Sequence, residues 1–401
     1  MRVLHTADWH PGKNLEGKSR LEEQSLFVED FIKIVNENQV DLVIIAGDVF
    51  DNSNPPAEAE SLFYNALKRI SSDGERLTLV IAGNHDSSER LVSSSPIAAL
   101  HGVIMVGTPK SIVPIGSYGK HKVIDSGEGF IEIEINSEKA VILTVPYPSE
   151  KRLNEVIYND MDSDFERNVS YSDKIKELFE SLSTHFRDDT INIAVSHLFA
   201  IGSEEGGSER GIELGGSYIV NKECFPKKAQ YIALGHIHKP QIVPGTDKKV
   251  RYSGSILQYN KKEAGSRKIV NIVDLKANEE CIIKEVELKC YKPIEIWKCD
   301  SIEEAIKMCE EHKDEESYVY LEISSDRIIL DDEIKTMKKT KDDIIEIIHA
   351  QNKEEEQESD YSIENKSFIE IFKDFYKKEK GIAPDDEIVD LLIKITDGGE
   401  L

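Results

Sequence analysis

Five short apolar runs, each ending abruptly in glycine or a polar residue, constrain the fold of this chain most strongly. Runs of this length predict buried strands, and the helical patterns between them are typical of layered α/β proteins. A rigid strand end fixes the side chain that follows it, while the next loop leaves that side chain open to a ligand. The runs are residues 3–7, 42–46, 77–82, 191–195 and 231–234.

Two helices are expected to cover the sheet that these runs form. Apolar residues recur at helical spacing in both, which gives each helix one buried stripe. The first stripe lies between the first two strands and contains Leu26, Phe27, Phe31, Ile34 and Val35. The second stripe follows Pro55-Pro56 and contains Leu62, Phe63, Leu67 and Ile70.

Near residue 286 the pattern changes to a smaller unit, for which we expect a compact β-α-β arrangement over residues 286–350. Its helix would begin at Ser301, because Glu304 follows at capping-box spacing. A strand is expected where apolar residues alternate, at Val319, Leu321 and Ile323, and a further one at 344–348.

The last fifty residues have a different character. Residues 351–361 are acidic and polar, which is typical of a solvated linker, although an exposed helix end fits as well. Apolar residues then repeat at helical spacing in two short segments separated by Gly381 and Pro384. We therefore expect C-terminal helices within residues 362–401.

Other bulk features mainly exclude classes of protein. No apolar run approaches the roughly 20 residues that cross a bilayer, and the N-terminus is polar within a few residues, so we expect a cytoplasmic protein. The five cysteines form no CxxC pair and are expected to be reduced and structural: Cys224, Cys281, Cys290, Cys299 and Cys309.

Side chains with metal-binding chemistry follow all five strands, in DxH, GDxxD, GNHD, SH and GHxH motifs. Alternate side chains of an extended segment point the same way, so both members of a DxH or HxH pair can face one point. One such motif would be weak, but five in order behind strands favour a metal centre over scattered polar residues. The residues are Asp8, His10, Asp48, Asn84, His85, His197, His236 and His238.

Mixed imidazole and carboxylate donors favour divalent transition ions such as Mn, Fe or Zn. Two such ions about 3.5 to 4 Å apart bridge a phosphate and activate water for in-line displacement. We therefore predict a phosphoester hydrolase with two divalent ions and with Asp48 as the bridge. The donors leave Mn, Fe and Zn open, and Mn²⁺ is the ion we expect. The other histidines lack this context and are taken as structural or solvated: His5, His101, His121, His185, His312 and His349.

The same motifs are similar to those of the calcineurin-like metallophosphoesterases over roughly the first 285 residues. Longer stretches resemble SbcD, the family of bacterial nuclease subunits: HTADWHPGK, GDVFDNSNPP, GNHDSSERL, SHLFAIGSEEGGSERGIELGG and YIALGHIHKPQ. This resemblance implies a four-layer α-β-β-α sandwich for residues 1–285. It also implies a small α/β capping domain at 286–350 and helices at 362–401.

The resemblance further implies which residues hold each ion. One ion would be held by Asp8, His10, Asp48 and His238, and the other by Asp48, Asn84, His197 and His236. His85 would contact the scissile phosphate or protonate the leaving oxygen instead of binding metal. The GDVFD block lacks the Arg-Gly of protein serine/threonine phosphatases, and GNHD replaces their GNHE, which disfavours phosphoprotein substrates.

By the same resemblance, the chain would cleave DNA together with an SbcC-type, SMC-like ATPase. The expected activities are a double-strand 3'-5' exonuclease and a single-strand or hairpin endonuclease, in DNA end processing, repair and recombination. Residues 362–396 would bind the ATPase, and the complex would hold two copies of each subunit. Packing of these helices on their own chain is the alternative.

Two other functions are considered. The first is a small-molecule or nucleotide phosphodiesterase, which would have little use for a capping unit and terminal helices. The second is a non-catalytic scaffold, which the complete ligand set disfavours.

The charge of the chain opposes DNA binding. The formal net charge is −26, of which −16 falls on residues 301–401. The glycine-rich loop at 202–216 either contacts DNA or a partner or is a plain solvent loop. Seven basic residues near the last ligand strand would either offset the charge or form a solvated hairpin: Lys248, Lys249, Arg251, Lys261, Lys262, Arg267 and Lys268.

Overall fold

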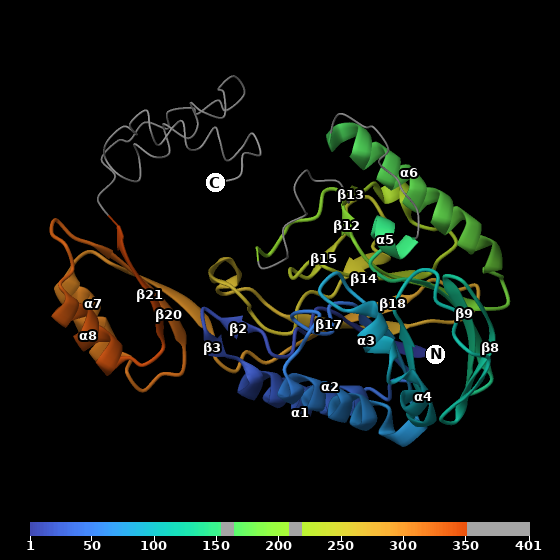
Figure 1. Cartoon of the computed structure of the whole chain (residues 1–401), viewed down its shortest axis with the longest axis horizontal. Helices are drawn as coiled ribbons and strands as arrows, with labels where there is room; N and C mark the ends of the chain where they lie inside the picture. Colours follow the sequence, from blue (N-terminus) through green and yellow to red (C-terminus); the bar gives the residue numbers. More distant parts are fainter. Residues whose placement is uncertain (154–163, 208–218, 351–401) are drawn as a thin grey trace, which may run out of the picture.

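The computed structural model describes residues 1–153, 164–207 and 219–350 of the 401-residue chain. Two β-sheets face each other, and helices cover the outer face of each sheet (Figure 1). The predicted four-layer α-β-β-α sandwich is thereby confirmed. A smaller three-stranded unit follows it in sequence and lies at one side of the sandwich (Figure 1).

The first sheet has the strand order β18-β17-β1-β4-β5-β6. Strands β1, β4, β5 and β6 are parallel, and β17 pairs antiparallel with β1. The strands are β1 (Arg2–Thr6), β4 (Leu42–Ala46), β5 (Leu77–Ile81), β6 (Val103–Val106), β17 (Ile269–Asp274) and β18 (Ile282–Glu287). All residues of β4 and β5 are buried, as expected for parallel strands covered on both faces.

Helices α1 (Leu21–Glu37) and α2 (Ala57–Ile70) cover the outer face of the first sheet. Most residues of the predicted stripes are buried, Ile34 and Leu62 are partly buried, and Leu26 is 46% exposed. The prediction for Leu26 is wrong, since the buried stripe of α1 runs through Glu23 and Gln24 at this end of the helix.

The second sheet has the order β15-β16-β14-β11-β10-β9-β8-β7. Helix α6 (Asp164–Leu182) covers its outer face through Tyr171, Ile175 and Phe179. The strands are β7 (Gly116–Tyr118), β8 (His121–Gly127), β9 (Phe130–Ile135), β10 (Glu138–Val145), β11 (Ile191–His197), β14 (Tyr231–Gly235), β15 (Gln241–Ile242) and β16 (Val250–Tyr252).

All five predicted strands are present, as β1, β4, β5, β11 and β14, with ends within two residues of the prediction. Their inward side chains form the apolar layer between the two sheets. Shorter elements complete the core: β2 (Asn14–Leu15), β3 (Lys18–Ser19), α3 (Ser88–Val92), α4 (Ser95–Ala98), α5 (Glu150–Leu153), β12 (Phe199–Ala200) and β13 (Ile219–Val220).

The smaller unit is a parallel sheet in the order β19-β20-β21, with two helices packed on one face. Its elements are β19 (Ile294–Cys299), α7 (Ile302–Glu311), β20 (Tyr318–Ser324), α8 (Asp331–Thr340) and β21 (Ile344–Ala350). The predicted helix start is confirmed, since the Ser301 hydroxyl accepts the Glu304 N–H at 3.1 Å. Helix α8 was not predicted.

Buried polar contacts join this unit to the core. The Arg20 guanidinium donates to the Gln258 carbonyl at 2.7 Å and pairs with Glu23, which also accepts the Tyr318 hydroxyl at 3.0 Å. The Gln258 side chain accepts the Ile294 N–H at 3.0 Å. The segment before β17 therefore contacts both parts of the molecule.

Some expectations lie outside the described residues: the linker at 351–361, the helices at 362–401 and most of the loop at 202–216. In the part that is described, no helix combines the length and apolar character needed to span a bilayer. All five cysteines are free thiols, and Cys224, Cys299 and Cys309 are buried, in agreement with a structural role.

Candidate metal centre

The predicted site residues follow strands of both sheets. Asp8, Asp48 and Asn84 come after β1, β4 and β5 of the first sheet, and His236 after β14 of the second. His197 is the last residue of β11. Because these strands point the same way within each sheet, their ends bring the side chains together between the two sheets.

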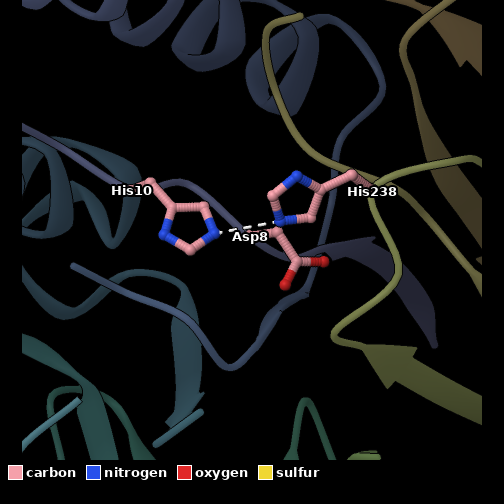
Figure 2. A group of neighbouring side chains, drawn as sticks. All are labelled: Asp8, His10 and His238. Atoms are coloured by element: carbon pink, nitrogen blue, oxygen red, sulfur yellow. Dashed lines mark hydrogen bonds between the residues drawn. The ribbon is translucent and has the colours of Figure 1, made fainter. Parts of the chain in front are cut away.

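Asp8, His10 and His238 form the first group, and one potential ligand atom from each lies within 4.8 Å of the others. The Nε2 atoms of His10 and His238 are 3.1 Å apart, and Figure 2 shows both rings beside the Asp8 carboxylate. The His236 N–H donates to both Asp8 oxygens, at 2.9 and 3.2 Å. All three side chains are buried.

Asp48, His197 and His236 form the second group, and Asn84 lies among them. Asn84 Oδ1 is 2.9 Å from His197 Nε2 and 3.1 Å from His236 Nδ1. The other ring nitrogen of His197 donates to the Ala46 carbonyl at 2.9 Å. In a neutral His197 ring, the lone pair of Nε2 therefore faces a lone pair of Asn84 Oδ1. A cation between these two atoms would stabilise the arrangement.

Asp48 lies between the two groups. Its Oδ1 accepts the His85 N–H at 3.0 Å, while Oδ2 is 3.7 Å from His10 Nε2 and 3.4 Å from His197 Nε2. Burial raises the pKa of this carboxyl, but the surrounding imidazoles outweigh that effect and hold it well below its usual value. An ionised, bridging position fits a carboxylate shared by two cations.

The electrostatics of the site favour positive charge at its centre. Burial alone would lower the pKa of His197, but the Asp48 and Asp8 carboxylates raise it to about 9. Burial raises the pKa of Asp8 to about 7 against the opposing effect of the histidines. The carboxylates and imidazoles of the site are the donors that divalent cations bind. Because metal ions compete with protons for these donors, we expect metal affinity to depend on pH.

Four of these residues have a backbone that only glycine adopts easily. The φ angles are 53° at Asp8, 47° at His10, 45° at Asp48 and 98° at His236. Each such conformation costs roughly 1 to 3 kcal/mol and persists where the surrounding structure imposes it, often at functional sites. The strain supports a functional role for these loops.

The glycines before the ligands act chiefly by being small. A Cβ at Gly83 would lie 2.1 Å from Asp48 N, and one at Gly235 would lie 1.9 Å from Ala46 O. Only Gly47 also has a positive φ, of 90°. Close approach of neighbouring loops, and not turn geometry alone, therefore requires these residues.

His85 differs from the other histidines of the site. Its Nδ1 donates to the Asp51 carbonyl at 2.6 Å. Its Nε2 is buried, has no hydrogen-bond partner among the described residues, and lies 3.9 Å from Asp48 Oδ2. The ring thus presents one unpaired nitrogen toward the centre.

Asp86 and Arg152 support the loops of the site, and neither was predicted from the sequence. The Asp86 carboxylate accepts N–H groups from Val49, Phe50 and Gly83 at 2.7 to 3.0 Å. Arg152 donates to the Gly83 carbonyl at 2.8 Å and to the Asp86 carbonyl at 2.6 Å. Asp86 is the last residue of the GNHD motif, so the sequence could have pointed to it. Arg152 lies in none of the motifs, so no motif indicated its role.

Four of the seven basic residues near the last ligand strand pair with carboxylates. Arg251 and Arg267 both pair with Glu285, and Lys261 pairs with Glu322 of β20. Lys268 is buried, at 6% exposure, beside Glu263. These contacts remove most of the cluster that would have offset the acidic charge.

The six histidines outside the motifs have structural or surface partners, as predicted. His5 and His121 are buried and bonded in the core, His185 stacks on Phe130, and the others lie at or near the surface. The surface pairs are His101 with Asp73, His312 with Glu315 and His349 with the Ser325 carbonyl.

Comparisons with known proteins agree with this site. Residues 1–240 match the family described as calcineurin-like phosphoesterase, and residues 290–380 match the type 5 capsule protein repressor C-terminal domain. The chain is 40% identical over 406 residues to the SbcD subunit of the SbcCD nuclease from Bacillus subtilis, covering 100% of this chain and 99% of that protein. The corresponding SbcCD nuclease subunit of Staphylococcus epidermidis is 27% identical over 387 residues, covering 94% and 93%.

Solved structures resemble the chain more distantly. A hypothetical protein from Thermus thermophilus aligns with a TM-score of 0.38 and 14% identity, over 72% of this chain and 100% of that one. A dimetal phosphatase from Danio rerio aligns with a TM-score of 0.36 and 12% identity, over 71% and 98%.

Proposed function

This chain belongs to the SbcD family of calcineurin-like phosphoesterases, and we propose that it is the DNA-cleaving subunit of an SbcCD-type nuclease. The observation that carries the proposal is the convergence of two histidine and carboxylate groups on the Asp48 carboxylate. Family membership supplies the substrate, since the site alone indicates only the hydrolysis of a phosphoester.

In this proposal, one ion is held by Asp8, His10, Asp48 and His238, and the other by Asp48, Asn84, His197 and His236. The short distances between donor atoms within each set support the division. When bound, the two ions would activate a water molecule and stabilise charge on the entering and leaving oxygens of the phosphodiester.

His85 is proposed as the residue that contacts the scissile phosphate or protonates the leaving oxygen. The Asp51 carbonyl fixes its Nδ1 proton, which leaves Nε2 directed at the centre. The His85 N–H also holds Asp48 Oδ1, so Oδ2 remains for the ions. One residue thus supports the bridge through its backbone and the chemistry through its ring.

Mn²⁺ is the proposed metal, and the mixture of imidazole, amide and carboxylate donors fits it, as it fits Fe and Zn. By its family, the chain would degrade duplex ends in the 3'-5' direction and cut single strands and hairpins. These finer activities belong to the proposal.

The proposed partners are DNA and an SbcC-type, SMC-like ATPase, which residues 362–396 would bind. We also propose a complex with two copies of each subunit. Four large apolar side chains are exposed and are candidates for a contact between copies. They are Ile97, Leu100, Ile112 and Ile115, exposed by 69%, 73%, 62% and 63%.

The test is a nuclease assay on blunt duplex and hairpin DNA, with Mn²⁺ and with Mg²⁺. His85→Gln should lower kcat by about 100-fold or more, because the proton donor is lost, while both ions still bind. His312→Gln is the matched control, since His312 lies at the end of α7 in the capping unit.

Full cleavage by His85→Gln would refute the assignment of that residue. Hydrolysis of p-nitrophenyl phosphodiesters without any cleavage of DNA, even with the ATPase subunit added, would favour a small-molecule phosphodiesterase instead. Absence of both activities with the ions bound would point to a scaffold.

A further inference from the structure

His238 depends for its orientation on a residue that none of the site motifs contains. Its Nε2 faces His10 Nε2 at 3.1 Å, so Nδ1 is the remote nitrogen that must carry the proton when Nε2 binds a metal ion. That Nδ1 lies 3.6 Å from a carboxylate oxygen of Glu263, which ends the short helix η5 (Lys261–Glu263). Both side chains are almost completely buried.

Lys268 holds Glu263 in place. Its ammonium donates to Glu263 Oε2 at 2.5 Å, to the Ser255 hydroxyl at 2.8 Å and to the His238 carbonyl at 3.0 Å. Each proton of the buried ammonium therefore has an oxygen partner, and the lysine also fixes the backbone of the ligand residue. The Tyr259 N–H adds a further bond to Glu263 Oε2 at 3.3 Å.

Buried ion pairs of this kind contribute little to stability compared with apolar residues of the same size, because both charges lose their hydration. A functional reason for keeping this pair is its position behind a ligand of the metal centre. A carboxylate that accepts the remote N–H of a ligating histidine fixes the ring and increases its basicity.

The other histidine ligands are held differently. His197 donates its Nδ1 proton to a backbone carbonyl, that of Ala46. His10 Nδ1 lies 3.8 Å from Asp51, but the Asp51–Lys13 pair is partly exposed, at 27% and 15%. His236 turns its Nδ1 toward the proposed ligand Asn84. The pair behind His238 differs from the one behind His10 in its burial, since Glu263 and Lys268 are only 2% and 6% exposed.

We infer that Glu263 is a positioning residue for the first ion of the proposed centre, acting through His238 and held by Lys268. The inference rests on the proposed function, because it needs an ion held by Asp8, His10, Asp48 and His238. Glu263 does not contact the substrate. Loss of Glu263 should weaken the binding of the first ion. The affinity for the ion held by Asn84, His197 and His236 should not change.

The experiment measures Mn²⁺ binding to the full chain by calorimetry and by electron paramagnetic resonance, which detects coupling between two neighbouring Mn²⁺ ions. Glu263→Gln cannot satisfy both neighbours, because in either orientation its NH₂ group faces a donor. We expect one ion at native affinity, the other weakened by about 10- to 100-fold, and loss of the coupled signal at limiting Mn²⁺. Excess Mn²⁺ should restore cleavage.

Glu322→Gln is the matched control. It breaks the Lys261–Glu322 pair at the other end of η5, and Glu322 contacts no residue of the site. This variant should bind two ions like the native chain.

If Glu263→Gln does not fold, Glu263→Leu combined with Lys268→Met removes both charges at similar volume and should fold. Native affinity for both ions in either folded variant overturns the role of Glu263. If the native chain itself binds fewer than two ions, the proposed centre fails instead, so the two failures are distinguishable.

Discussion

His5 lies in β1, three residues before Asp8, yet both of its ring nitrogens have partners in the core. Nδ1 is 2.8 Å from the Tyr231 hydroxyl, and Nε2 is 3.1 Å from the Leu234 carbonyl. Burial lowers the pKa of this imidazole from 6.5 to about 3. The folded chain therefore keeps His5 neutral at a pH where the unfolded chain protonates it.

The sign of the pH effect follows from this shift. Above pH 6.5 His5 is neutral in both states and has no effect, and as the pH falls from 6.5 toward 3 only the unfolded state gains a proton. The free energy of unfolding should therefore fall on acidification, by about 1.4 kcal/mol per pH unit for this one group. His5→Gln should make the measured slope shallower by that amount.

Urea unfolding of the chelator-treated chain at pH values between about 6 and 4 measures the slope. His101→Gln, a surface substitution, should leave it unchanged. Equal slopes for His5→Gln and the native chain would show that His5 titrates alike in the folded and unfolded states.

At the scale of single residues, the motifs identified the side chains that the structure brings together at the centre. They did not identify Glu263, which follows His238 by 25 residues in the polar run KKEAGSRK. That run is typical of a surface, and only the tertiary structure buries Glu263 and Lys268. For the same reason, charge composition could not show that Arg251 and Arg267 share one acidic partner.

At the scale of elements, Asp86 connects the loop after β4 with the loop after β5. Three N–H groups donate to its carboxylate, and these loops carry Asp48 and Asn84. Asp86→Ala leaves those buried donors unpaired, so the free energy of unfolding should fall by about 2 kcal/mol or more. Metal affinity should fall as well, since both ligands lose their support.

Thermal unfolding with and without Mn²⁺ checks this expectation. Glu29→Gln, which breaks an exposed pair with Arg69 on the helices, should change the stability by less than about 1 kcal/mol. A native-like stability of Asp86→Ala would mean that water replaces the carboxylate at no cost.

The elements themselves were predictable where burial is strong. The five strands before the site are fully or almost fully buried, so their apolar runs were visible in the sequence. Helix α8 was missed because Met337 is its only buried residue and its other positions are mostly charged. The exposed Leu26 shows the converse, since an apolar residue at helical spacing need not face the core.

For the whole molecule, the proposed division of labour separates cleavage from partner binding. Deletion of residues 362–401 should abolish binding of the ATPase subunit, because the proposed contact lies there. The centre draws its ligands from residues 8–238 and should still bind two ions. Co-purification with the ATPase subunit and metal content by mass spectrometry test the two halves.

A chain that lacks residues 351–361 but keeps residues 362–401 is the control, and it should retain the ATPase subunit. Retained binding by the chain without residues 362–401 would assign the contact to the core or to the smaller three-stranded unit instead.

The position of β1 determines when the molecule becomes active during its own synthesis. β1 leaves the ribosome long before its partner β17, whose residues are made more than 260 positions later. The ligands of the centre are likewise far apart in sequence, since Asp8 and His238 belong to the same group. A growing chain therefore carries only some of the ligands of the metal centre. Nucleic acid near the ribosome does not meet an active nuclease until the core is complete.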